Sequence, residues 1–333
     1  MKNIKKIGFS ALAGALAMTA AHAGSVSMTG SMEITYTKGS GYQDTGNPLG
    51  QENEMTIAAS TELDNGVTVS YTRSLTAVQA GSDSELKFGG VLGGDLSMTS
   101  TGNPISAIDD VTPTAFEEAN AQVGSITDVN GSDGTFGIRY TVADVAGTGW
   151  KLDYMYFPKH GTGDATADQA FSGGGHGNKD AHDITLTGSV PGVDGLDIGF
   201  GYARLNNDLA ANANSEQNEG TVYAKYAYGP LSVGVQVGAV AKSGLGGQSF
   251  KNQMLGISYA VSDDLSVSYN MLEARRSGGA HSARSMEQDF DSVSLSYSMG
   301  GMTIGIADAD CGNCSWTEDR SQDETTISLS VAF

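Results

Sequence analysis

The feature that most constrains the fold of this chain is an alternation of apolar and polar residues, which recurs in short segments up to the last residue. In residues 25–36, SVSMTGSMEITY, the apolar Val26, Met28 and Met32 share one parity, and Ser, Thr and Glu occupy the other. Successive side chains of a β-strand point to opposite faces, so a period of two predicts a strand with one apolar face. We therefore expect a chain built mainly of β-strands.

Seven pairs of such segments are separated by short turns and are expected to form hairpins. The residue types of Asp64-Asn65-Gly66 and Gly229-Pro230, for example, favour tight reversals. The predicted turns lie near residues 64–66, 93–94, 147–149, 191–195, 229–230, 262–264 and 300–301. Together with the first strand and a last strand at residues 327–333, the hairpins make sixteen strands. An even number is what closure of an antiparallel barrel requires.

The connections between the hairpins are longer than the turns and are rich in Gly, Ser, Asn and charged residues. They are expected near residues 38–52, 75–83, 101–133, 158–180, 205–219, 242–249, 274–287 and 308–323. Short turns at one end of the strands and long loops at the other are typical of outer-membrane barrels. The pattern therefore predicts an all-β fold, a sixteen-stranded antiparallel transmembrane β-barrel.

The composition agrees with this architecture and excludes others. The chain has 333 residues with 46 Gly and 6 Pro, which is a turn-rich composition. After the first 23 residues, no apolar run approaches the 18 residues that a membrane-spanning helix needs, so helical spans are excluded. The formal net charge of −20 repels nucleic acids, so a nucleic-acid partner is disfavoured.

The first 23 residues have the pattern of a cleaved secretory signal peptide. Lys2, Lys5 and Lys6 form a basic start, residues 7–21 are apolar, and Ala21-His22-Ala23 is a small-x-small cleavage site. The apolar run is too short to favour an uncleaved anchor. The exported barrel domain is therefore expected to be residues 24–333.

A soluble β-sandwich or a secreted β-solenoid would show the same alternation. Sixteen strands joined only by hairpins are too many for an ordinary sandwich, and no short repeat of fixed length supports a solenoid. Aromatic residues also gather near the ends of the apolar faces, as in membrane barrels: Tyr36, Tyr71, Tyr140, Trp150, Tyr156, Tyr202, Tyr226 and Tyr228. A secreted structural or adhesive β protein without a channel is the alternative, and it predicts solubility without detergent.

Four segments resemble the trimeric general-diffusion porins of the Gram-negative outer membrane. They are SELKFGGVLGGDLSMTS (84–100), PISAIDDVTPTAFEE (104–118), FGIRYTV (136–142) and the C-terminal SLSVAF. The resemblance implies a water-filled pore for small hydrophilic solutes, a homotrimer, and contact with outer-membrane lipid and lipopolysaccharide. It also implies that Phe333 belongs to the signal read by the barrel-assembly machinery.

By strand count, residues 101–133 correspond to the third loop, which in the resembled family folds inward and narrows the pore. The resemblance then assigns the acidic side of the constriction to Asp109, Asp110, Glu117 and Glu118. Basic residues that alternate with apolar ones on the strands are expected to face the lumen opposite them: Lys87, Arg139, Lys151 and Lys225. Apolar residues of the loop are candidates for packing on the inner wall: Ile105, Ile108, Val111 and Phe116.

The chain departs from the family on its first two strands, where lumen positions carry Glu33 and Glu54 instead of basic residues. The pore wall is therefore expected to be less positive than usual, which predicts weak cation selectivity. Arg73 and Arg204 lie on the apolar parity near loop ends and are expected to reach the membrane interface, not the pore.

Two channel functions stay open on the sequence. The lumen positions are mostly Ser, Thr, Gly and Ala, which favours a non-specific porin for passive diffusion of ions and small solutes. A substrate-specific outer-membrane channel with a binding site at the constriction would be expected to carry lumenal aromatic tracks or dense ladders of charge.

No enzymatic activity and no cofactor are expected. The histidines outside the signal peptide are scattered and no nucleophile motif accompanies them: His160, His176, His182 and His281. His176 and His182 could hold a metal within the Gly-rich residues 173–183, but a flexible loop is favoured. Acids expected in the last loop could bind calcium, although solvated charge is favoured: Asp308, Asp310, Glu318 and Asp319.

Cys311 and Cys314 are the only cysteines and lie in a C-x-x-C spacing. A zinc site would need two more soft ligands nearby, and a redox motif would need a thioredoxin-like context. In the oxidising envelope that a signal peptide implies, a small loop disulfide is favoured.

Overall fold

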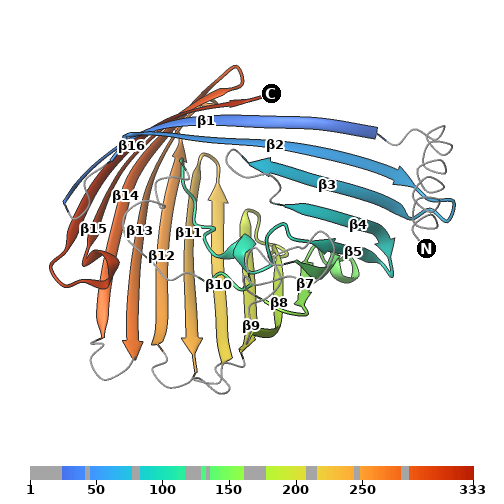
Figure 1. Ribbon diagram of the computed structural model, residues 1–333. Helices are drawn as coiled ribbons and strands as arrows, with labels where there is room; N and C mark the ends of the chain where they lie inside the picture. The colour runs from blue at the N-terminus through green and yellow to red at the C-terminus, as the bar shows by residue number, and fades with distance from the viewer. Residues whose placement is uncertain are drawn as a thin grey trace, which may run out of the picture.

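The structure, a computed structural model, describes residues 25–41, 46–76, 83–116, 129–132, 136–160, 178–207, 216–243, 248–278 and 285–333. They form a closed barrel in which each strand pairs with its neighbours in the sequence and β1 pairs with β16. Figure 1 shows the strands following one another around a single wall. The predicted sixteen-stranded antiparallel barrel is confirmed.

The strands of the first half are β1 (Ser25–Gly41), β2 (Leu49–Glu62), β3 (Thr68–Thr76), β4 (Ser84–Val91), β5 (Gly94–Thr99), β6 (Gly137–Val142), β7 (Lys151–Phe157) and β8 (Asn178–Ser189). Those of the second half are β9 (Leu196–Asn207), β10 (Glu216–Tyr228), β11 (Leu231–Lys242), β12 (Gln248–Ala260), β13 (Leu265–Gly278), β14 (Met286–Met299), β15 (Met302–Gly312) and β16 (Ser321–Ala332). The described connections contain the 3-10 turns η1 (Ser106–Ile108), η3 (Val145–Gly147) and η4 (Cys314–Trp316). Within the described ranges, no helix is long and apolar enough to cross a membrane.

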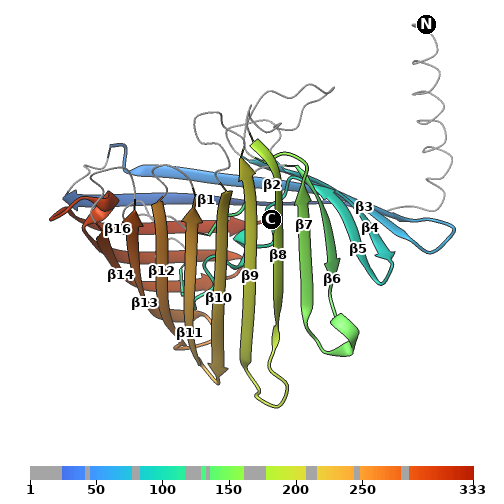
Figure 2. The same ribbon diagram turned by 90° about the horizontal axis from the view of Figure 1, so that it is seen from below.

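The barrel closes between its first and last strands. β1 and β16 run antiparallel in a register that pairs Met32 with Val331. Two backbone hydrogen bonds fix the chain end to β1: Phe333 N–H donates to Gly30 O at 2.9 Å, and Gly30 N–H donates to Phe333 O at 2.8 Å. The chain end lies at the rim of the short turns, because Ala332 N–H donates to Gly301 O in the turn between β14 and β15 at 3.4 Å. Figure 2 shows two other short turns, which join β6 to β7 and β8 to β9, at the lower edge of the view.

The two faces of the wall differ as the alternation predicts. On β11, Val235 and Val237 are 51 % and 43 % exposed on the outer face, whereas Gln236 between them is 2 % exposed on the inner face. The outer face thus presents large apolar side chains to its surroundings, as a barrel in hydrocarbon requires. Buried inner positions are mostly polar or small, among them Ser97, Thr185, Thr221, Asn252, Ser268, Asn270, Ser294 and Thr326.

The strands extend further toward the long connections than the alternation predicted. β8 begins at Asn178 and β13 reaches Gly278, and both residues were expected in loops. β15 runs to Gly312, so the prediction that Asp308 and Asp310 lie in the last loop is wrong; that connection comprises residues 313–320. Polar residues on both faces hide the period of two at these strand ends, but pairing between strand backbones does not require apolar side chains.

Candidate functional site

The connection between β5 and β6 contacts the inner wall of the barrel along its described residues, 100–116 and 129–132. Ile105, Ile108, Phe116 and Val129 are buried, with exposed fractions of 0 %, 6 %, 7 % and 2 %. Ile105 and Val129 pack in one cluster with apolar residues from the inward parity of β7, β8, β9, β11 and β12: Met155, Phe157, Ala181, Ala203, Leu205, Val240 and Phe250. In Figure 1 this segment, in teal, crosses from β5 toward the opposite strands.

Gln236 fixes the middle of this connection through hydrogen bonds to its backbone. Its Nε2 donates to Ile108 O and to Asp109 O, both at 2.7 Å, and its Oε1 accepts from Val111 N–H at 3.0 Å. The amide lies on the inner face of β11 and is almost fully buried. Because one rigid strand supplies both donor and acceptor, the conformation around Asp109 is defined by the wall.

Farther along the connection, polar residues of β13 bind the backbone around Pro113. Asn270 Nδ2 donates to Pro113 O at 3.0 Å, and Ser268 Oγ accepts from Ala115 N–H at 2.9 Å. The wall here is lined by glycine: a Cβ on Gly256 would lie 2.6 Å from Pro113 O. The absence of side chains at such positions lets the segment approach the strand backbone closely.

The returning end of the connection is held by a buried carboxylate on β10. Glu219 Oε2 accepts hydrogen bonds from the successive N–H groups of Asn130 and Gly131, each at 2.7 Å. Asn103 Nδ2 donates to Asn130 O at 2.8 Å and so joins the outgoing and returning ends. Hydrogen bonds to a charged acceptor are about twice as strong as neutral ones, so Glu219 is a strong anchor.

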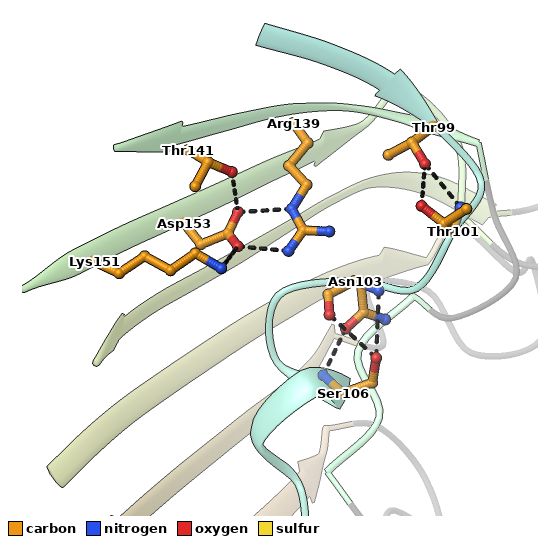
Figure 3. A network of polar contacts seen from close by, with 8 residues as sticks. All are labelled: Thr99, Thr101, Asn103, Ser106, Arg139, Thr141, Lys151 and Asp153. Carbon is orange, nitrogen blue, oxygen red and sulfur yellow. Dashed lines mark hydrogen bonds and ion pairs between the residues drawn. The ribbon is translucent and has the colours of Figure 1, made fainter. Parts of the chain in front are cut away.

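A second group of polar residues lies on the inner face of β6 and β7 (Figure 3). Asp153, 2 % exposed, binds Arg139 through Nε–Oδ1 at 2.8 Å and Nη2–Oδ2 at 2.5 Å. Lys151 Nζ lies 3.0 Å from Asp153 Oδ2, and Thr141 Oγ1 donates to Oδ1 at 3.0 Å. Two of the predicted wall cations therefore share one carboxylate, which was not among the predicted site residues.

Along the regular parts of the described strands, the inner face carries more acids than bases. Inward positions on the regular parts of the strands hold the acids Glu33, Glu52, Glu54, Glu62, Glu85, Asp95, Asp153, Asp183, Asp197, Glu219 and Glu324. They hold the bases Lys87, Arg139, Lys151, Lys225, Lys242 and Arg276. The wall therefore has net negative charge, before the acids of the β5–β6 connection are added.

A protein-family model described as Gram-negative porin matches residues 9–332 of the chain. The chain belongs to the Gram-negative porin family. Membership together with the barrel fold makes it an outer-membrane channel protein, as the sequence resemblance implied.

Solved structures of similar fold include other outer-membrane proteins. Vibrio cholerae OmpT in its trimer form gives a TM-score of 0.68 at 9 % identity, covering 93 % of this chain and 100 % of that chain. An anion-selective porin from Comamonas acidovorans gives 0.67 at 13 %, covering 93 % and 100 %. OmpF of Salmonella typhi with daunomycin gives 0.66 at 12 %, covering 94 % and 99 %. At these identities the likeness shows the fold alone. A comparison with curated proteins finds no match.

The remaining predicted pore residues of this porin lie on the inward parity of β1, β2, β4 and β10. Lys87 is on β4, and Lys225 on β10 lies with Nζ 5.6 Å from the ring centroid of Tyr223. Glu33 on β1 accepts a short hydrogen bond from Ser330, and Glu54 on β2 accepts one from Thr56 at 3.0 Å. Lys87 is level with Arg139, because the two residues pair with Ser97 of β5 from opposite sides. Among the described residues, no ion pair joins Lys225, Glu33 or Glu54 to Arg139 or Lys151. The role of these four residues in the pore stays a prediction.

The acidic side of the predicted constriction is described only in part. Asp109 is half-buried and Asp110 is exposed, directly beside the peptide groups that Gln236 holds. Glu117, Glu118 and the predicted signal peptide lie outside the described residues, as do His176 and His281.

The other predicted residues lie away from the β5–β6 connection. Arg204 is exposed on the outer parity and pairs with Glu216 at 2.5 Å, and Arg73 shares that parity on β3. His182 lies on the outer parity of β8, where its Nδ1 is 2.8 Å from Tyr154 Oη and its Nε2 is 3.1 Å from Asp180.

The acids that were considered as calcium ligands, with solvated charge favoured, are divided between a strand and a loop. Asp308 and Asp310 point outward from β15, and Glu318 and Asp319 lie in the last connection. No three His, Cys, Asp or Glu side chains of the described residues come close enough together to hold a metal ion.

Sequence reasoning missed the inner residues that hold the β5–β6 connection. Gln236 and Glu219 are single polar residues within ordinary alternation, and nothing in the local pattern marks them. The apolar cluster does leave a signal, because Met155, Phe157 and Leu205 are large apolar residues on the lumen parity. Such residues indicate that another part of the chain covers that stretch of wall.

Proposed function

We propose that this porin is a general-diffusion channel, weakly selective for cations, through which ions and small hydrophilic solutes move down their gradients. The observation that carries the proposal is the charge balance of the inner face, where acids outnumber bases along the strands. A sixteen-stranded barrel is wide enough to hold water, so transport needs no chemical step.

The pairing of basic residues with carboxylates supports selectivity for cations over anions. Arg139 and Lys151 both contact the buried carboxylate of Asp153, and Glu85 interacts electrostatically with the same guanidinium. A cation paired at this distance attracts a passing anion less than a free cation does, because the carboxylate field opposes it. In this proposal, Asp109 and Asp110 of the β5–β6 connection add further negative charge to the lumen.

The expected selectivity is weak because water screens the charges. Two unit charges separated by about 8 Å of water interact by only ~0.5 kcal/mol. That energy changes the local concentration of each ion by about twofold for each charge, in opposite directions for cations and anions. Several charges bias the flux a few-fold without excluding the other sign.

We further propose that the chain is exported by a cleaved signal peptide, inserted by the barrel-assembly machinery and assembled as a homotrimer in contact with lipopolysaccharide. Support for the trimer comes from the family and from the trimer form described for the similar Vibrio protein. The terminal Phe333 lies 73 % exposed on the outer surface, where another protein can reach it. The absence of enzymatic activity stays a prediction.

Reconstitution into planar bilayers with a potassium chloride gradient tests the channel and its sign together. We expect stable conductance steps and a reversal potential that favours K⁺ over Cl⁻ by a few-fold. The double variant Asp109→Asn with Asp110→Asn should lower that preference, whereas Asp263→Asn with Asp264→Asn in an opposite-rim turn should not. Absence of conductance contradicts the channel; preference for chloride contradicts the selectivity.

The substrate-specific channel is distinguished in the same preparation. Tyr223 is a buried aromatic residue on the lumen parity, beside Lys225, and a binding site for a sugar could include such a ring. Conductance that is blocked in a saturable way by one sugar, amino acid or phosphate would replace the general-diffusion proposal.

A further inference from the structure

The connection between β15 and β16 also folds onto the inner wall of the barrel. It is a different segment of the chain from the β5–β6 connection. We call residues 313–320 the strap. Cys314, at the start of the strap, is 1 % exposed and packs in a cluster with inward residues of β12, β13, β14 and β15: Met254, Leu272, Ala274, Phe290, Ala309 and Cys311. The strap therefore covers part of the lumen side of the wall, at the rim of the long connections.

Through Trp316, the strap contacts residues on β12 and β13. The Trp316 ring lies 5.6 Å from the ring centroid of Phe250 on β12, and Arg276 Cζ on β13 lies 5.3 Å from the Trp316 ring. At its base, Asn313 Nδ2 donates to Glu287 O at 3.0 Å, just before Gln288 on β14. Neighbouring strands are about 4.8 Å apart, so contacts from β14 to β12 extend the strap roughly 10 Å along the wall from β14.

Backbone conformation indicates that this arrangement is imposed by its surroundings. Asn313, Ser315, Trp316 and Asp319 all have positive φ, between 53° and 60°. Left-handed conformations are unfavourable for residues with a Cβ and persist only where other contacts enforce them. The disulfide between Cys311 and Cys314 spans the first of these turns, and Cys314 N–H donates to Arg320 O at 2.9 Å to close the strap.

Arg276 supplies an independent observation. Within the described residues, its Nε is buried without a hydrogen-bond partner, and no ion pair to its guanidinium is found. The positive charge on this inward position is held on the face of Trp316 and not neutralised by a carboxylate, which distinguishes it from Arg139. A cation on an aromatic face keeps its charge and thus its long-range field.

Trp316 also packs against the apolar cluster that contains Ile105 and Val129 of the β5–β6 connection. The strap and that connection therefore share one packed region inside the barrel.

We propose that the strap forms a second narrowing of the pore, at the mouth on the long-connection side, in which Trp316 limits the size of admitted solutes and Arg276 opposes cation entry. The inference rests on the proposed channel function. It assigns size selection for neutral hydrophilic solutes to the mouth, and it makes Trp316 and Arg276 specificity-determining residues of the channel.

Uptake of sugars by liposomes tests the size limit. Wild type, Trp316→Ala and Trp316→Phe are compared with a mono-, a di- and a trisaccharide: glucose, sucrose and raffinose. We expect Trp316→Ala to raise the ratio of raffinose to glucose rates by about twofold, because steric exclusion at the mouth is relieved, and Trp316→Phe to restore most of the wild-type ratio. An unchanged ratio in Trp316→Ala overturns the proposal.

The charge is tested by the reversal potential of Arg276→Gln. Removing an unpaired positive charge from the mouth should increase the preference for K⁺ by about twofold. Lys38→Gln, on the outer parity of β1, is the matched control and should leave the potential unchanged. If Arg276→Gln behaves like the control, the guanidinium does not face the ion path and that part of the proposal fails.

Fluorescence tests the position of the strap without relying on transport. The chain has two Trp residues, so Trp150→Phe leaves the emission of Trp316 alone. In that background we expect weak quenching by iodide. Quenching should be stronger after the further changes Cys311→Ala and Cys314→Ala, or when the folded Trp150→Phe protein is treated with a dithiol reductant. Equal, strong quenching in all forms contradicts the claim that the strap packs against the inner wall. If glucose does not enter wild-type liposomes, the channel function fails while the fluorescence result still decides whether the strap is packed.

Discussion

Arg139 and Asp153 form a two-point ion pair on the inner wall of the barrel, with Nε–Oδ1 at 2.8 Å and Nη2–Oδ2 at 2.5 Å. They face each other from the neighbouring strands β6 and β7, and Lys151 contacts the same carboxylate. A family pattern of basic wall residues, considered without their partners, would predict a positive wall here. The pairing instead leaves these two cations with one shared counter-charge.

Replacing Asp153 should change the ion preference of the channel. Asp153→Asn removes the counter-charge of Arg139 and Lys151 and makes this stretch of wall more positive. We expect the K⁺ to Cl⁻ permeability ratio to fall by a few-fold, because one unit charge across ~8 Å of water changes the local concentration of each ion by about twofold, in opposite directions. Reversal potentials in a potassium chloride gradient measure the change.

Two further variants control this prediction. Arg139→Gln should shift the ratio in the opposite direction, toward K⁺, because it leaves the carboxylate less compensated. Asp64→Asn, in the exposed turn between β2 and β3, should leave it unchanged. If Asp153→Asn and Arg139→Gln shift the potential in the same direction, the pair acts through barrel structure and not through its charge.

Gln236 is expected to control the position of the β5–β6 connection. Gln236→Leu leaves Ile108 O, Asp109 O and Val111 N–H without their partners. Each buried polar group that loses its partner costs about 1–3 kcal/mol, so this part of the connection should detach from the wall. We expect greater current noise and altered single-channel conductance, with the barrel still folded; Gln253→Leu, toward the outer face of β12, is the matched control.

Glu219 should have a similar role at the returning end, with an added dependence on charge. Glu219→Gln keeps the size of the side chain but replaces the charged acceptor of Asn130 and Gly131 N–H. Hydrogen bonds to charged groups contribute about 1.5–3 kcal/mol, against about 1 kcal/mol for neutral ones. Limited proteolysis should therefore cut the β5–β6 connection faster than in wild type. Equal cleavage rates would show that the apolar cluster alone holds this end.

Glycine on the inner wall should be required for close approach of the β5–β6 connection. A Cβ on Gly305 would lie 2.5 Å from Phe116 Cδ2, closer than any real contact. Gly305→Ala should therefore push Phe116 from the wall, at a cost of about 1–3 kcal/mol, and change the single-channel conductance. Gly220→Ala, whose Cβ would meet Gly201 O only at 3.7 Å, should leave both stability and conductance near wild type.

The sequence predicted the wall of the barrel well because local rules control it. Val235, Gln236 and Val237 alternate in the sequence and face opposite sides in the structure, as strand geometry demands. The turns at Gly229-Pro230 and Gly300-Gly301 were placed by residue type and are turns in the structure. Strand ends were predicted less well, as at Asp308 and Asp310, because polar residues occupy both faces there.

For the candidate site, the sequence predicted which charged residues face inward but not which of them pair with one another. Strand parity placed Arg139 and Lys151 on the inner face, but it could not show that Asp153 binds both of them. The contacts of Gln236 with Ile108 and Asp109, and of Trp316 with Phe250, join residues far apart in the chain.

The sequence by itself determined the number of strands, their order around the barrel and which face of each strand is apolar. Those properties follow from residue-by-residue alternation and from turns, both of which act over a few neighbouring residues. Only the tertiary structure decided which inner charges are paired and how the β5–β6 connection and the strap lie against the wall. These depend on contacts across the barrel, whose partners become neighbours only after β1 and β16 close it.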